Sequence, residues 1–65
     1  MYVIYIKFFN GKEGYYVGVD DDDIIFSNTV SGAKKFSSRM SAGYAEGYYL
    51  SGFEDIIDYT KVISV

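Results

Sequence analysis

The sequence contains no cysteine and no histidine. Disulfide bonds are therefore impossible, and the usual zinc and iron sites, which need thiolate or imidazole ligands, are excluded. A chain of 65 residues has room for one domain, 1–65, and domains near this size bury only about 60% of the surface that the unfolded chain exposes. Because small domains often depend on disulfides, metals or association, we expect oligomerisation or a partner to add stability here.

Basic residues and long hydrophobic runs are also scarce. The chain has six Lys and Arg residues and nine Asp and Glu residues, which gives a net charge of −3. Phosphate binding depends on basic side chains, so direct nucleic-acid binding is not expected, although a basic spot at Lys34, Lys35 and Arg39 leaves a weak nucleic-acid-binding role open. No apolar run approaches the roughly 18 residues of a membrane span, and Tyr2–Ile6 is too short and aromatic for a signal segment. We expect no membrane partner and a cytoplasmic location.

The residues that are present predict a folded domain that begins with a β-hairpin. Apolar residues make up 49% of the chain and aromatic residues 20%, too many for a disordered segment. Residues 2–9 combine β-branched and aromatic side chains and predict a strand. Asn10-Gly11 is typical of a tight hairpin turn into a second strand at Tyr15–Asp20, although Lys12–Gly14 can lengthen the loop. Ile24–Phe26 predicts a short third strand or an apolar plug.

Alternation assigns the two faces of the predicted hairpin. The core face of the first strand carries Tyr2, Ile4, Ile6 and Phe8, and Lys7 marks the other face as the wetter one. The matching choice in the second strand turns Tyr15, Val17 and Val19 inward. The outer face then carries an aromatic patch of Tyr5, Phe9 and Tyr16.

The middle of the chain predicts one main helix. A single helix over 31–50 would have one face, expected to be the buried one, made of Phe36, Met40, Gly43, Tyr44, Gly47 and Leu50. Ser37 and Ser38 are also good N-terminal caps, and we favour a turn at 32–36 followed by a helix at 39–50. Gly43 and Gly47 each cost about 1 kcal/mol of helix propensity, so we expect them to allow close approach of the sheet or, alternatively, of a second copy of the helix.

Gly52 ends the predicted helix, and Tyr59–Val65 forms a closing strand. The inward face of that strand is ambiguous, because Tyr59 and Ile63 share their parity with Lys61. The predicted fold class is α+β, with an antiparallel sheet of three to four strands packed on one main helix.

Catalytic and metal chemistry are poorly supported. Without histidine or cysteine, a chain of this size offers few groups and little room for a water-excluding cleft, so we expect no enzymatic activity and no cofactor. Asp20–Asp23 is contiguous and lacks the alternating ligands of a calcium loop. A solvated acidic loop is the better interpretation, and Glu54, Asp55 and Asp58 form a second acidic cluster.

Eight tyrosines are the main compositional excess, and binding surfaces use tyrosine for large contact area at low entropic cost. We expect Tyr2, Tyr15 and Tyr44 in the core. The predicted partner-binding residues are Tyr5, Phe9, Tyr16, Tyr49, Asp20, Asp21, Asp22, Asp23, Glu54, Asp55 and Asp58.

The chain resembles a group of small bacteriophage and prophage proteins in the order of its motifs. These are YYVGV at 15–19, an acidic stretch, GAKKF at 32–36 followed by two serines, and KVISV at 61–65. The resemblance implies an accessory or anti-defence role, such as an anti-CRISPR inhibitor that binds a host effector. The expected partner is thus a host protein, including a nucleic-acid-processing defence effector, or a second copy in a homodimer. Imitation of DNA by the acidic clusters is the alternative.

Overall fold

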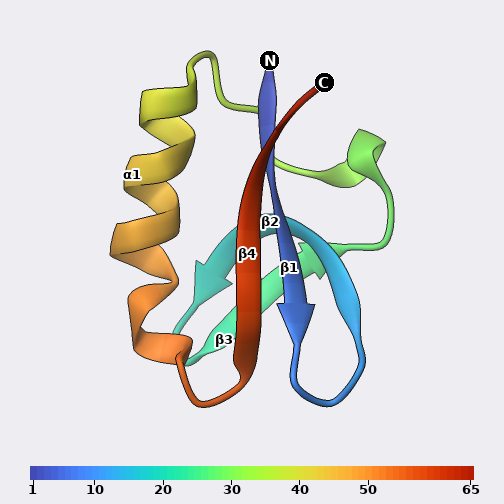
Figure 1. The fold of residues 1–65 in the computed structure, drawn as a ribbon, viewed down its shortest axis with the longest axis vertical. Helices are drawn as coiled ribbons and strands as arrows, with labels where there is room; N and C mark the ends of the chain where they lie inside the picture. Colours follow the sequence, from blue (N-terminus) through green and yellow to red (C-terminus); the bar gives the residue numbers. More distant parts are fainter.

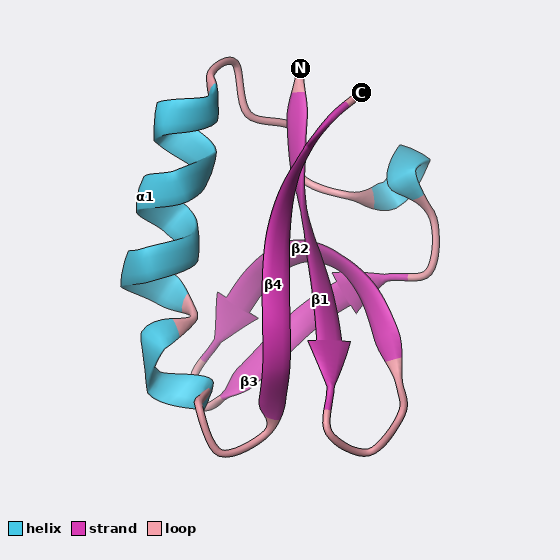
Figure 2. Ribbon diagram, in the orientation of Figure 1, coloured by secondary structure: helices cyan, strands magenta, loops and turns pink.

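The computed structural model describes residues 1–65 and shows one antiparallel sheet with one α-helix packed against it (Figures 1 and 2). The predicted α+β fold is therefore confirmed, with four strands in the order β3-β2-β1-β4. The two chain termini lie side by side at one end (Figure 1). The elements are β1 (Tyr2–Phe8), β2 (Glu13–Asp20), β3 (Asp23–Ser27), α1 (Arg39–Tyr49) and β4 (Ile57–Ser64), with short 3₁₀ turns at Val30–Gly32 and Ser51–Phe53.

The β1–β2 hairpin closes through a three-residue loop, 9–11. The Phe8 N–H donates to the Lys12 carbonyl over 2.9 Å, and the Gly11 N–H donates back to the Phe8 carbonyl over 3.1 Å. Gly11 has φ +93°, a left-handed conformation that glycine adopts without strain. Tyr5 therefore pairs with Tyr15. A two-residue Asn10-Gly11 turn would instead pair Tyr5 with Tyr16. Such a shift of one residue in the register turns every side chain of the strand to the opposite face of the sheet.

This register corrects the predicted faces of β2. Tyr16 lies in the core with only 4% of its surface exposed, so its predicted place in an exposed binding patch is wrong. Its ring stacks between Phe36 at 6.3 Å and Tyr49 at 6.4 Å. Tyr15 lies on the outer face beside its pairing partner Tyr5, so the prediction that Tyr15 is a core residue is wrong. Val19 still packs on the core, because a bulge between Tyr16 and Gly18 shifts the register with β3.

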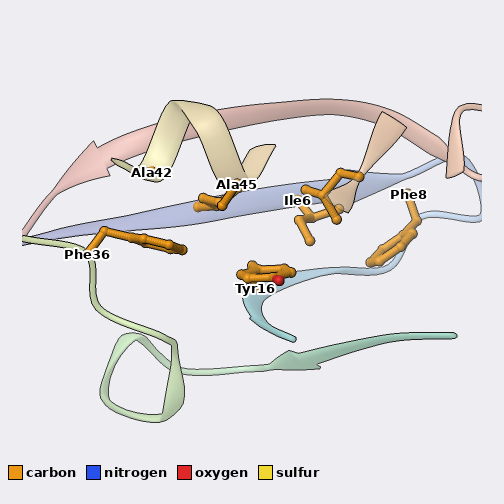
Figure 3. Close-up of a cluster of buried hydrophobic side chains, with 8 residues drawn as sticks. Ile6, Phe8, Tyr16, Phe36, Ala42 and Ala45 are labelled. Carbon is orange, nitrogen blue, oxygen red and sulfur yellow. The ribbon is translucent and has the colours of Figure 1, made fainter. Parts of the chain in front are cut away.

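The core lies between α1 and the predicted inner face of β1. Ile4 and Ile6 are fully buried and Phe8 is 7% exposed. Ala42 and Ala45 of α1 point toward the same layer as Phe36 and Tyr16 (Figure 3). Phe36 is held there because the segment before the helix pairs with the first residue of β1. It exchanges two backbone hydrogen bonds with Tyr2, of 2.9 and 2.8 Å.

The helix begins where the favoured interpretation placed it, but it buries a different face. Ser38 caps α1 by accepting from the Ser41 N–H over 3.1 Å. Met40 is 84% exposed and Tyr44 is 68% exposed, so the prediction that they pack on the core is wrong. The sheet side already supplies bulky isoleucine and aromatic side chains, and a close-packed layer then has room only for the small alanines. No helix in the structure has the length and apolar character needed to cross a membrane.

The helix glycines do not serve close packing. Nothing lies within 4 Å of the position that a Cβ would take at Gly43 or Gly47, so the predicted approach of the sheet to these residues is wrong. We expect Gly47→Ala to stabilise the protein by about 1 kcal/mol, since alanine removes the propensity penalty of an exposed helix glycine. Thermal unfolding should then shift upward by about 4–8 °C.

Gly14 is the matched control for this substitution. A Cβ at this position would collide with the Phe26 ring and lie 2.9 Å from the Ser27 carbonyl oxygen. Gly14→Ala should therefore lower the melting temperature. A lower melting temperature for Gly47→Ala would reveal a constraint on α1 that the packing does not explain.

Candidate functional site

A row of three tyrosines crosses the sheet on the face opposite α1. We call Tyr5, Tyr15 and Tyr59 the tyrosine face. The Tyr5 ring lies 5.9 Å from the Tyr15 ring and 6.0 Å from the Tyr59 ring. Tyr5 and Tyr15 are half-buried, whereas Tyr59 is 43% exposed. Because the rings come from three adjacent strands, β2, β1 and β4, the sheet itself holds their spacing.

Charged side chains border the tyrosine face. Lys7 forms an ion pair of 3.3 Å with Glu13, directly opposite it on β2. The Lys61 Nζ lies 5.6 Å from the centre of the Tyr59 ring, within the range of a cation–π interaction. An aromatic centre with a mixed charged rim is typical of protein-binding surfaces.

The environment of Tyr5 disfavours its ionised form. Desolvation is the largest cause, followed by the Glu13 carboxylate and then by Tyr59, and together they raise the pKa of Tyr5 to about 12. Burial and Tyr49 also raise the pKa of Tyr16. Neutral phenol groups are thus favoured at both positions.

The pKa of Tyr5 predicts a dependence of stability on alkaline pH. A pKa raised in the folded state stabilises the fold below the unfolded value of 10.0, and this contribution is lost as pH rises toward about 12. Tyr5→Phe should therefore unfold with a shallower loss of stability over this window, measured by urea denaturation at a series of pH values. The loss should be reduced rather than abolished, because Tyr16 contributes to it. An unchanged slope would show that Tyr5 ionises normally.

The structure separates the aromatic residues that the sequence grouped together. Phe9 is 63% exposed in the hairpin loop, where it lines two clefts beyond the end of β1. Tyr49 is 47% exposed, as predicted, but it belongs to α1 on the other side of the sheet. Only Tyr5 of the predicted aromatic residues lies in the tyrosine face. Val3, on the same face, is fully buried, so the exposed part begins at Tyr5.

The acidic segments meet at one end of the molecule. A cleft of about 530 Å³, which we call the acidic cleft, is lined by Asp21 and Asp22 of the β2–β3 turn, by Asp23 at the start of β3, and by Asp55. Its remaining lining residues include Val19, Phe53 and Ile56, and none is Lys or Arg. Asp20 ends β2 beside this turn. Acidic residues from two distant parts of the sequence thus line one cleft together with apolar side chains.

The other members of the second acidic cluster lie elsewhere. Glu54 and Asp58 line a separate cleft of about 410 Å³ with Phe9 and Tyr59. A third cleft, of about 430 Å³, shares Asp23, Asp55 and Ile56 with the acidic cleft and adds Lys12. The sequence identified these carboxylates but not which of them the fold brings together.

The predicted basic spot is occupied by contacts within the chain. The Lys35 Nζ donates to the carbonyls of Val30 and Ala33. The Arg39 guanidinium lies 5.4 Å from the Tyr2 ring. Lys34 lies 5.7 Å from the Phe36 ring. These contacts orient the three cations without neutralising them. A labelled single strand is still expected not to shift at low salt, because the net charge of the chain is −3.

The two surfaces offer contact area and charge. No group of three or more His, Cys, Asp or Glu residues is arranged to hold a metal ion. Tyrosine rings suit contact with a protein surface, and uncompensated carboxylates suit a basic one. No family model matches the chain, and neither a curated protein nor a solved structure matches it.

Proposed function

We propose that this protein is a non-catalytic recognition module that binds a partner protein through the tyrosine face. The observation that carries the proposal is the row of Tyr15, Tyr5 and Tyr59, held across three strands on the sheet face that α1 does not cover. Each ring offers a large amphipathic contact surface with few rotatable bonds. The neighbouring strands fix the rings before binding, which reduces the entropy lost on association.

The resemblance to bacteriophage and prophage proteins supplies the class of partner. A host defence protein such as a CRISPR effector fits a small module without catalytic residues, because inhibition then needs only occupation of a surface. The ion pair of Lys7 with Glu13 and the exposed Lys61 would contribute orientation at the rim rather than most of the affinity, since rim charges contribute little to binding energy.

Affinity capture from a bacterial host lysate tests this proposal. The immobilised protein should retain a host protein, and the double variant Tyr5→Ala/Tyr59→Ala should lose it. Tyr44→Ala/Tyr48→Ala is the matched control, because it removes two tyrosines that are 68% and 63% exposed on α1. Both variants should keep the circular dichroism spectrum of the wild type. Normal capture by the folded Tyr5→Ala/Tyr59→Ala variant would exclude the tyrosine face.

The acidic cleft supports a second candidate function, imitation of DNA. The specific observation is that Asp21–Asp23 and Asp55 meet around one cleft that no Lys or Arg lines. Such a site would occupy the basic groove of a nucleic-acid-binding protein. Spaced carboxylates there would replace phosphates, and affinity would come mainly from charge.

Salt distinguishes the two candidates. Binding dominated by the acidic cleft should weaken steeply between low and moderate ionic strength, because exposed charges are screened over about 8–10 Å. The variant Asp22→Asn/Asp23→Asn should weaken it at low salt. Capture that persists in high salt and in this variant would leave the tyrosine face as the binding surface.

A further inference from the structure

The outer edge of β4 carries a row of backbone groups without partners. Met1 and Val65 exchange backbone hydrogen bonds at one end of the β1–β4 ladder, and the Phe9 N–H donates to the Ile56 carbonyl at the other. Hydrogen-bonded pairs alternate along an antiparallel ladder, so Ile63 and Lys61 direct their backbone groups to β1. The residues that alternate with them, Thr60, Val62 and Ser64, direct their backbone groups away from the sheet.

The other side of β1 supports this assignment. Tyr2 exchanges two backbone hydrogen bonds with Phe36, and Phe8 donates to the Lys12 carbonyl and accepts from the Gly11 N–H, all on the β2 side. The even-numbered residues of β1 therefore face away from β4. β4 is the last strand of the sheet, and no loop or turn backbone bonds to Thr60, Val62 or Ser64. Backbone N–H and C=O groups normally find a hydrogen-bond partner, and these six groups have none within the chain, although the Thr60 side chain donates to Glu46 of α1.

The two edge strands of the sheet, β3 and β4, differ in how well they could pair with a strand of another chain. β3 has five residues and begins at the end of the aspartate run. β4 has eight residues with two charges, Asp58 near its start and Lys61, and it contains no proline. Long edges with few charges are the ones that pair with another strand.

We propose that β4 pairs antiparallel with β4 of a second copy of this chain, about a two-fold axis at Val62. Thr60, Val62 and Ser64 are symmetric about Val62. In this register Val62 lies opposite Val62 of the second copy, and Thr60 lies opposite Ser64. All three N–H and all three C=O groups on each edge then gain a partner, and the two sheets become continuous. The register shift at Asp58, opposite Lys7 and Phe8, marks where the paired segment ends.

Side chains and charge favour a second copy as the occupant. On the outer face Lys61 lies opposite Ile63 and Tyr59 opposite Val65, so no like charges are directly paired. The acidic cleft lies beyond Ile57, five residues before the axis. At about 3.4 Å per residue, the two acidic ends are then about 34 Å apart, well beyond the screening length of about 8 Å. The pairing is independent of the proposed function, because both tyrosine faces remain open on the same side.

The mass of the purified protein over a range of concentrations tests this pairing. Sedimentation equilibrium from micromolar to millimolar should show a shift from 7.3 kDa toward twice that mass. Ser64→Pro removes one outward N–H from each copy without removing a bond to β1, and it should weaken the dimer by about tenfold or more. Ser64→Ala, which keeps the N–H, should dimerise as the wild type does. A wild type that stays at 7.3 kDa throughout would overturn the proposal.

Amide hydrogen exchange gives an independent readout that needs no variant. The amides of Thr60, Val62 and Ser64 should exchange quickly at low concentration and become protected as the mass doubles. A dimer that leaves these three amides unprotected would place the contact elsewhere and contradict the pairing. Protection that appears only when a different protein is added would assign the edge to that protein and equally overturn the homodimer.

Discussion

Replacement of Ile6 by alanine is expected to leave most of the protein unfolded at 25 °C. Ile6 is fully buried between the sheet and α1, and truncation of such a side chain costs about 2–5 kcal/mol. A core of this size supplies only about 3–5 kcal/mol of net stability, and no disulfide supports it. Far-ultraviolet circular dichroism and urea denaturation measure the loss.

Ile25→Ala is the matched control for Ile6→Ala. Ile25 is 45% exposed on β3, so its truncation should change the free energy of unfolding by no more than about 0.5 kcal/mol. A cooperative Ile6→Ala unfolding transition at the wild-type urea concentration would mean that the core is not centred on β1.

Tyr16→Ala is expected to destabilise the protein far more than Tyr15→Ala. Truncation of a buried aromatic residue costs about 3–5 kcal/mol, and Tyr16 is stacked between Phe36 and Tyr49 with 4% of its surface exposed. Tyr15 is half-buried on the face that α1 does not cover, where its removal forfeits mainly the edge contact with Tyr5, about 1 kcal/mol. Urea denaturation of the two variants measures the difference.

The comparison of these two tyrosines is informative because they are neighbours in the sequence and share their chemistry. Only the face on which each side chain lies distinguishes them. Equal destabilisation, or greater destabilisation by Tyr15→Ala, would show that β2 has the opposite orientation.

The strands were largely predictable from the sequence, but the hairpin register was not. Alternation identified Ile4, Ile6 and Phe8 as core residues because one face of a strand repeats every second residue. Asn10-Gly11 is compatible with a two-residue turn as well as with the three-residue loop 9–11 that the structure contains. In the structure Asn10 accepts a hydrogen bond from the Lys12 N–H through its side chain, and Phe9 joins the loop. One added loop residue reversed the faces of β2, which local propensity does not determine.

The helix shows the same division between local and tertiary information. Its first residue followed from the Ser38 cap, a local hydrogen bond. Its buried face did not, because the sequence pattern favours bulky residues such as Met40 and Tyr44, whereas the core selects Ala42 and Ala45. The volume left for α1 depends on rings contributed by segments distant in sequence.

The candidate site was predictable in part. Tyr5 was identified from the parity of β1. Tyr59 was not, because the parity of β4 alone is ambiguous, and its pairing with Lys7 on β1 assigns it to the outer face. The acidic cleft depends on the β2–β3 turn lying near Asp55, a contact between distant parts of the chain that carries no local sequence signal.

The tyrosine face exists only if the hairpin has the three-residue loop, and nuclear magnetic resonance tests this directly. In the observed register Tyr5 and Tyr15 form a pair that does not exchange backbone hydrogen bonds, and the Cα atoms of such pairs are only about 4.5 Å apart. The nuclear Overhauser spectrum should therefore contain a strong Hα–Hα cross-peak between Tyr5 and Tyr15. A cross-strand contact of Tyr5 with Tyr16 in its place would contradict the register and, with it, the tyrosine face.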